Sequence, residues 1–218
     1  MRIKDRVGNI SREIPENVLL VAATKNRSAE EIMEAVDAGI KTIGENYIQE
    51  AEKKFPAIGK RVGWHMLGHL QRNKAEKAVD IFDMVETVDN LKLAKKLNRV
   101  ASGKGLAYEV LIEVNSGREE GKSGVFPENA ARLAEDIGKL GNIKIRGLMT
   151  MGPFLEDFRK IRPYFRLSRE LFEEIGSLKI PGVEMEFLSM GMSDTWRIAI
   201  EEGANIVRLG TLLFGPRN

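Results

Sequence analysis

Short apolar, β-rich runs alternate along this chain with longer amphipathic stretches, and this alternation constrains the fold more than any other feature. Eight runs have the length and composition of strands, namely residues 18–23, 41–44, 62–67, 83–88, 107–115, 144–150, 184–190 and 205–209. Strands that alternate with helices form parallel sheets, because parallel neighbours need a right-handed crossover connection. Eight near-equal units predict an α/β fold, a single (β/α)8 TIM barrel with one domain over residues 1–218.

A doubly wound parallel sheet is the alternative arrangement of alternating strands and helices. That fold carries a glycine-rich turn directly after its first strand. Here the first run is followed by Thr24-Lys25-Asn26-Arg27, which contains no glycine. We therefore expect the closed barrel.

The stretches between the runs carry helix signals. Ser28 and Glu31 have the spacing of a capping box, and Pro127 suits the first turn of a later helix. The segment 156–176 has a helical pattern, but Pro163 lacks the backbone N–H that a helix interior needs. We expect Pro163 to interrupt this helix.

Two further helix starts and an additional helix are expected. Asp89 is in position to cap a helix after the fourth run. Ser193 and Asp194 are in position to cap the last long helix, which runs to Gly203. Residues 1–13 form a charged amphipathic stretch that predicts an extra N-terminal helix covering the bottom of the barrel.

The charge balance and the residue types exclude several classes of function. With 34 basic and 32 acidic residues the net charge is +2, which lacks the basic excess that a nucleic-acid partner requires. The chain has no cysteine, which excludes thiolate metal sites, and its two histidines, His65 and His69, leave little room for a histidine-built metal centre. No apolar run is long enough to span a membrane, and residues 1–6 do not resemble a signal peptide, so we expect a cytoplasmic protein.

Two loops near the end of the chain have the properties of an anion site. In TIM barrels phosphates commonly bind after strands seven and eight. Residues 189–193 supply backbone N–H groups and serine hydroxyls ahead of a helix, and Gly210 and Thr211 follow the eighth run. Either loop alone is typical of an ordinary helix cap or tight turn. Together they predict a phosphate site.

Lys25 and Arg208 indicate which other chemical groups the phosphate-bearing molecule would carry. Lys25 stands at the exit of a buried strand, where low-dielectric surroundings favour the neutral amine that forms a Schiff base with an aldehyde, including that of pyridoxal phosphate. The other interpretation is an ordinary strand-end lysine that reaches water. Arg208 can point into the barrel mouth, either to donate to a pyridine nitrogen or to pair with a carboxylate such as Glu186.

Other strand ends leave alternatives open. Asn46 is expected either to bond a ring hydroxyl or to cap the next helix. His65 either lines the pocket or is a hydrogen-bonded core histidine, and Gly68 argues against a helical metal pair between His65 and His69. Asn115 faces the mouth, where it could lie beneath an aromatic ring.

Seven motifs together resemble a known family. They are Val21-Ala22-Ala23-Thr24-Lys25, Gly44-Glu45-Asn46-Tyr47-Ile48-Gln49-Glu50, Trp64-His65-Met66-Leu67-Gly68-His69-Leu70-Gln71 with Asn73-Lys74, Lys122-Ser123-Gly124, Arg146-Gly147-Leu148-Met149, Leu188-Ser189-Met190-Gly191-Met192-Ser193-Asp194, and Arg208-Leu209-Gly210-Thr211 with Phe214-Gly215. They run in order along the whole chain, which resembles the YggS/PROSC-type pyridoxal-phosphate-binding proteins, also called pyridoxal phosphate homeostasis proteins.

The resemblance implies a fold and a set of cofactor residues. The fold would be the barrel of the alanine racemase N-terminal domain, which is that of fold-type III pyridoxal-phosphate enzymes. Lys25 would form the Schiff base with pyridoxal 5'-phosphate, Arg208 would face its pyridine nitrogen, and Asn46 would lie near it. The residues that would hold the phosphate are Gly191, Met192, Ser193, Gly210 and Thr211.

The resemblance also implies a role. Racemases of this fold use a second acid or base, normally a tyrosine from another domain, and the sequence offers no obvious partner for Lys25 among Tyr47, Tyr108 and Tyr164, with Tyr47 left open. We expect a non-catalytic, monomeric protein that buffers pyridoxal phosphate or delivers it to apo-enzymes that use it. The alternatives are a small pyridoxal-phosphate-dependent amino-acid racemase and a phosphosugar-type barrel enzyme without this cofactor.

Overall fold

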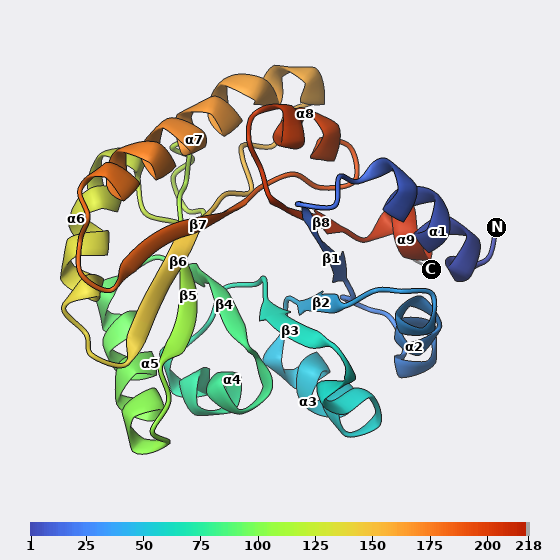
Figure 1. Ribbon diagram of the computed structural model, residues 1–218, viewed down its shortest axis with the longest axis horizontal. Coiled ribbons are helices and arrows are strands. Elements are labelled where there is room, and N and C mark those ends of the chain that lie inside the picture. Colours follow the sequence, from blue (N-terminus) through green and yellow to red (C-terminus); the bar gives the residue numbers. More distant parts are fainter. Residues whose placement is uncertain (217–218) are drawn as a thin grey trace.

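A computed structural model, which describes residues 1–216, contains eight parallel strands that close into a barrel in sequence order, with β8 pairing back onto β1 (Figure 1). The strands are β1 (Leu19–Ala23), β2 (Thr42–Glu45), β3 (Gly63–Met66), β4 (Met84–Val88), β5 (Tyr108–Glu113), β6 (Ile143–Met149), β7 (Val183–Ser189) and β8 (Ile206–Leu209). Every predicted run is confirmed as a strand, and the ends differ by at most two residues. The predicted TIM barrel is therefore confirmed.

Helices follow the strands and surround the barrel (Figure 1). They are α1 (Ile3–Glu13), α2 (Ala29–Asp37), α3 (Ile48–Ile58), α4 (Ala75–Ile81), α5 (Leu91–Gly103), α6 (Pro127–Gly138), α7 (Arg162–Ser177), α8 (Trp196–Glu201) and α9 (Thr211–Phe214). The extra N-terminal helix is confirmed, but its place is not under the barrel. It packs in the outer layer against α2 and α9, where Val7 and Ile10 are buried.

Two of the expected helix starts are confirmed and one proline was misjudged. Ser28 and Glu31 form the capping box of α2, and Pro127 begins α6. Pro163 does not interrupt a helix. It lies in the first turn of α7, after a short 3-10 turn at Phe158–Ile161, because first-turn residues need no intrahelical N–H bond.

The cap of α5 is Asn90 and not Asp89. The side chain of Asn90 accepts a hydrogen bond of 2.9 Å from the backbone N–H of Leu93. Asp89 accepts instead a bond from the backbone N–H of Gly124, so its carboxylate ties the end of β4 to the loop after β5. Only the residue immediately outside the helix has the geometry to reach its first free N–H groups.

The predicted cap at Ser193 and Asp194 is also wrong. The helix α8 has six residues and starts at Trp196, with Thr195 as its flanking residue. The side-chain hydroxyl of Thr195 turns back to the backbone N–H of Met192 at 3.0 Å. Ser193 and Asp194 therefore belong to a hydrogen-bonded turn before α8, and the anion site expected here would depend on the groups of this turn and not on a long helix.

The inside of the barrel is filled by two small apolar clusters. Their members are Val21, Leu67 and Ile206 in one, Met84, Leu111 and Met149 in the other, with Phe187 against both. Gly147 lets β6 and β7 approach, because a Cβ there would lie 1.8 Å from the carbonyl oxygen of Phe187. The larger core lies between the barrel and its helices.

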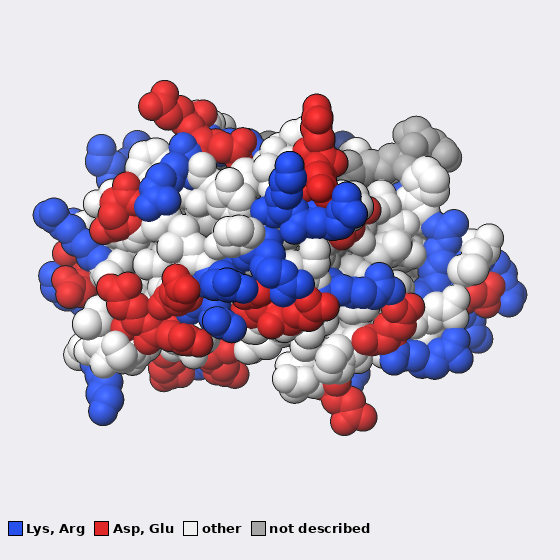
Figure 2. All heavy atoms as spheres, turned by 90° about the horizontal axis from the view of Figure 1, so that it is seen from above, with Lys and Arg blue, Asp and Glu red and all other residues white. Residues whose placement is uncertain are grey.

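Basic and acidic side chains are interspersed on the face that Figure 2 shows, without a large area of one sign. This agrees with the small net charge of +2. Within residues 1–216, no helix is both long and apolar enough to cross a bilayer.

Candidate functional site

The mouth of the barrel is floored by buried polar side chains. Each lies two residues beyond an interior apolar residue of its strand and therefore faces the same interior, as the pairs Met84 and Glu86, Leu111 and Glu113, Phe187 and Ser189, and Ile206 and Arg208 show. Carboxyl ends of barrel strands are where TIM-barrel sites are built. This polar layer therefore marks the functional end of the barrel.

Arg208 is held by a chain of short hydrogen bonds. Its Nη1 donates to Ser189 Oγ at 2.6 Å, and Ser189 Oγ donates to Glu86 Oε2 at 2.6 Å. The second oxygen of Glu86 lies 2.6 Å from Nδ1 of His65. The Nη2 group of Arg208 donates to the backbone carbonyl of Thr150 at 2.8 Å. The guanidinium is thus fixed in a buried position.

The carboxylate that faces Arg208 is Glu86 and not Glu186, at 3.9 Å from Nη1. Glu186 pairs instead with Arg146, so the predicted ion pair is wrong. Burial raises the pKa of Glu86, but the hydrogen bond and charge of His65 and the charge of Arg208 outweigh burial and hold that pKa below its ordinary value. For the Arg208 guanidinium, burial lowers the pKa, but the group stays charged at neutral pH.

His65 is a hydrogen-bonded core histidine. It is 7% exposed, bonds to Glu86, and does not line the mouth cavity. Asn115 lines the mouth cavity, as expected, and its side-chain amide donates to the carbonyl of Glu119 and accepts from the N–H of Glu119. Asn115 therefore shapes the loop after β5. Among residues 1–216 no histidine, aspartate and glutamate side chains gather into a group that could hold a metal ion.

Lys25 lies beyond the end of β1, two residues after the interior residue Ala23. Its side chain is half-buried, and its Nζ donates to the hydroxyl of Tyr47 at 3.3 Å. The same Nζ lies 4.9 Å from the centre of the Tyr47 ring. The sequence left Tyr47 open, and the structure places it directly against the lysine.

A buried ion network fixes the turn that carries Lys25. Lys54 of α3 donates to the carbonyl of Thr24 at 2.9 Å, to Glu45 Oε1 at 2.7 Å and to Glu50 Oε2 at 2.9 Å. Glu50 also accepts from the backbone N–H of Asn26, whose φ is +60°. The hydroxyl of Thr24 donates to Glu45 at 2.6 Å. These bonds bracket Lys25 on both sides.

The loops after β7 and β8 meet at the mouth. The Thr211 hydroxyl donates to Ser193 Oγ at 2.9 Å, and the backbone N–H of Arg208 donates to the carbonyl of Gly191 at 3.0 Å. Gly191 has φ of +93°, and a Cβ there would lie 2.6 Å from the side chain of Ala199. The two candidate phosphate loops therefore form one corner.

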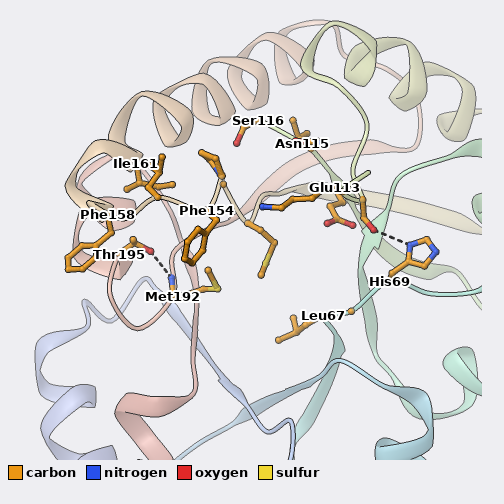
Figure 3. A pocket seen from close by; sticks show the side chains of 18 of the residues that line it. Leu67, His69, Glu113, Asn115, Ser116, Phe154, Phe158, Ile161, Met192 and Thr195 are labelled. Atoms are coloured by element: carbon orange, nitrogen blue, oxygen red, sulfur yellow. Dashed lines mark hydrogen bonds between the residues drawn. The ribbon is translucent and has the colours of Figure 1, made fainter. Parts of the chain in front are cut away.

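A cavity of about 520 Å³ opens beside this corner (Figure 3). Of the predicted cofactor residues, Asn46 and Met192 line it. Asn46 does not cap α3, whose flanking residue is Tyr47 with no side-chain cap, so that interpretation of Asn46 is wrong. Figure 3 shows His69 and Glu113 on one side of the cavity and Phe154 and Phe158 on the other. The cavity therefore has a polar wall and an apolar wall.

The Glu113 carboxyl at the end of β5 is the least satisfied polar group of the mouth. Its side chain is 7% exposed, and Oε2 is buried without a hydrogen-bond partner in the described part of the chain. Burial, reinforced by the charge of Asp89 and opposed by that of Arg208, raises the pKa of Glu113 to about 7.

The fold and the site define an alanine-racemase-type barrel with a lysine after β1 and a polar corner after β7 and β8. The family model described as alanine racemase, N-terminal domain, matches residues 1–218. A solved alanine racemase from Clostridium difficile 630 superposes with a TM-score of 0.81 and covers 99% of this chain and 56% of its own, but its 15% identity shows the fold alone.

Curated relatives are much more similar. The pyridoxal phosphate homeostasis protein of Aquifex aeolicus is 43% identical over 199 residues, which cover 91% of this chain and 86% of the relative. That of Escherichia coli K12 is 35% identical over 209 residues, covering 94% and 88%. The solved structure of PipY from Synechococcus elongatus with PLP bound has 34% identity and a TM-score of 0.90, covering 98% and 100%. The chain belongs to the family of the pyridoxal phosphate homeostasis proteins.

Several residues of the site were not singled out from the sequence, namely Glu45, Lys54, Glu86 and Glu113. Glu86 and Glu113 each stand within an otherwise apolar run, in Met84–Val88 and Tyr108–Glu113. A charged residue in a fully buried strand is rare unless it is paired, so a glutamate within an apolar run of the sequence already indicates a buried polar site. The partners of these groups come from distant strands and could not be read from spacing.

Proposed function

We propose that this protein binds pyridoxal 5'-phosphate at the barrel mouth through a Schiff base with Lys25 and acts in intracellular pyridoxal phosphate homeostasis, by buffering or delivery. The observation that carries the proposal is the placement of Lys25, after β1, at the same barrel mouth as the buried Arg208 and the joined loops after β7 and β8. The relative PipY was solved with PLP bound. The cofactor, when bound, supplies an aldehyde that a lysine amine can capture.

The residues present fit the chemical groups of this cofactor. Ser193 and Thr211 bring two hydroxyls within 2.9 Å of each other, and we assign them to the phosphate together with the backbone of Gly191, Met192 and Gly210. We assign Arg208 to the pyridine nitrogen, because its guanidinium is buried and its direction is fixed by Ser189 and Thr150. Asn46, which lines the adjoining cavity, is assigned to the neighbourhood of the ring.

We further propose that the protein is a non-catalytic, cytoplasmic monomer that passes the cofactor to apo-enzymes that use it. Two of the three tyrosines support the non-catalytic part of this proposal. Tyr108 is buried and donates to the backbone carbonyls of Ala78 and Phe82, and Tyr164 packs on the outer core. Neither is in reach of a group bound at Lys25.

The second candidate function is a small pyridoxal-phosphate-dependent amino-acid racemase. The observation in its favour is the contact of Tyr47 with Lys25, which brings a second proton-carrying group to the lysine. Deuterium exchange at the α-carbon of alanine separates the two functions. Sustained exchange by wild type that is lost in Tyr47→Phe supports the racemase. A wild-type protein that catalyses no exchange supports the carrier.

Uptake of the cofactor tests the proposal. Wild-type protein incubated with pyridoxal phosphate should gain the absorbance of a Schiff base, and Lys25→Ala should not, whereas the exposed-lysine control Lys53→Ala should behave as wild type. Ser193→Ala and Thr211→Ala should chiefly weaken retention, and Arg208→Ala should shift the spectrum. Wild type that takes up no cofactor, or Lys25→Ala that takes it up equally, contradicts the proposal.

A further inference from the structure

The wall of the cavity beside the cofactor corner includes Glu113, a carboxyl group with one enclosed oxygen that no described residue satisfies. Glu113 Oε2 has no hydrogen-bond partner in the described part of the chain, and the residue is only 7% exposed. Glu113 lines the cavity, while Lys25, Arg208, Gly210 and Thr211 do not. The Glu113 carboxyl group therefore borders a space that also includes Asn46 and Met192 but not the proposed Schiff-base lysine.

The charged groups around Glu113 leave it without an ion-pair partner. From β8, Arg208 is bonded to Ser189 and Thr150 and acts on Glu113 only through its charge. From the end of β4, Asp89 repels the carboxylate.

Two basic side chains of the cavity wall are engaged by other groups. Lys122, from the loop after β5, pairs with Glu119 at 2.6 Å. His69, from the loop after β3, lies 3.4 Å from Ser123 Oγ. A buried carboxylate without a partner is costly, and a ligand that donates hydrogen bonds and carries positive charge would satisfy it.

The opposite wall is apolar and comes from the segment after β6. Met151, Phe154, Phe158 and Ile161 line it, and the first three are 41%, 86% and 47% exposed. Figure 3 shows Phe154 and Phe158 across the cavity from Glu113. Exposed large apolar side chains that line one cavity are typical of a ligand-binding surface.

We propose that this cavity binds a primary ammonium ligand with an apolar substituent, and that the Glu113 carboxylate is the counter-charge of the ammonium group. The ligand's substituent packs against Phe154 and Phe158. The lining carries two acidic residues, Glu113 and Asp194, and one lysine, Lys122, which is already paired with Glu119, so it favours a cation over an anion. The inference goes beyond the proposed function. The cavity shares Asn46 and Met192 with the proposed cofactor site, but the ammonium group is held by Glu113, which that site does not use.

The ionisation of Glu113 gives binding a defined pH dependence. An ammonium ligand pairs with the ionised carboxylate, whose pKa in the free protein is about 7. A primary alkylamine, like lysine, stays protonated across this range. The affinity should therefore rise as the pH increases from 6 to 8 and change little above that.

Calorimetric titration of cofactor-free protein with 2-phenylethylamine tests the proposal, with the neutral 2-phenylethanol as the matched probe. At pH 8 wild type should bind the amine about 10- to 100-fold tighter than the alcohol, because a hydrogen bond to a charged group is stronger than one between neutral groups. Glu113→Gln should remove this preference and leave alcohol binding unchanged. The control Glu120→Gln, which neutralises an exposed carboxylate of the neighbouring loop, should retain it.

Equal amine affinities in wild type and Glu113→Gln, or no amine binding by wild type, would overturn the inference. Thermal unfolding of each variant confirms that it is folded, and glutamine has nearly the shape of glutamate. Cofactor uptake is read separately from absorbance. Amine binding without cofactor uptake therefore contradicts only the proposed function, and cofactor uptake without a Glu113-dependent amine preference contradicts only this inference.

Discussion

Neutralising Glu113 should make the protein more stable, and the gain should depend on pH. A carboxyl whose pKa is raised in the folded state binds its proton more tightly there than in the unfolded chain. Below the ordinary value both states are protonated and the residue contributes nothing. As the pH rises, the unfolded chain loses its proton first, and the folded state is progressively disfavoured until the pH passes the folded pKa.

The magnitude follows from the two values. The pKa of Glu113 rises from 4.5 to about 7, and each unit corresponds to about 1.4 kcal/mol, so the full penalty is about 3 kcal/mol. Most of this penalty develops between pH 5 and pH 8. Glutamine at this position cannot ionise, and it therefore escapes the penalty.

Urea unfolding of cofactor-free wild type and Glu113→Gln at pH 5 and pH 8 measures the effect. The variant's advantage in free energy of unfolding should be about 2–3 kcal/mol larger at pH 8 than at pH 5. Comparing the two proteins at each pH removes the contribution of all other titrating groups. An advantage that is the same at both pH values would refute the reasoning that burial of this carboxyl raises its pKa.

Three substitutions test other parts of the structure. Ser189→Ala leaves Arg208 and Glu86 without their shared hydrogen-bond partner. The free energy of unfolding should therefore fall by about 1–3 kcal/mol, and pyridoxal phosphate retention should weaken. The exposed-serine control Ser177→Ala should change neither quantity. Lys54→Met leaves the buried Glu45 carboxylate unpaired and should lower the free energy of unfolding by about 3–5 kcal/mol. The loss should be smaller at low pH, where Glu45 is protonated, and an equal loss at all pH values would contradict this reasoning. Gly147→Ala places a Cβ 1.8 Å from a backbone oxygen and should lose more than about 4 kcal/mol in chemical unfolding, whereas Gly141→Ala, where nothing lies within 4 Å, should lose little.

The barrel could be predicted from the sequence because every strand is signalled locally. An apolar run such as 18–23 or 205–209 needs no partner to be recognised, and the regular alternation with helices leaves few possible topologies. The predictions were wrong where the local sequence is compatible with two positions for a helix end or cap. Pro163 can end a helix or begin one, and Asp89 and Asn90 are adjacent candidates for the same cap, so only the backbone path decides between them.

The site could be predicted only in part. The proximity of Ser193 and Thr211 could be predicted because chain order places them at neighbouring strand ends, and the structure joins their hydroxyls at 2.9 Å. The support of Lys25 by Lys54 and the hold of Glu86 and Ser189 on Arg208 were not predicted. These bonds join residues 30, 19 and 103 positions apart, and their pairing depends on the register of the strands and not on local spacing.

Borohydride reduction tests the central claim most directly. Sodium borohydride converts a Schiff base between a lysine and pyridoxal phosphate into a stable secondary amine. Wild-type protein loaded with the cofactor, reduced and digested, should carry the pyridoxyl group on the peptide that contains Lys25 when the peptides are mapped by mass spectrometry. A label confined to other lysines, or no label in protein that has taken up the cofactor, would contradict the account.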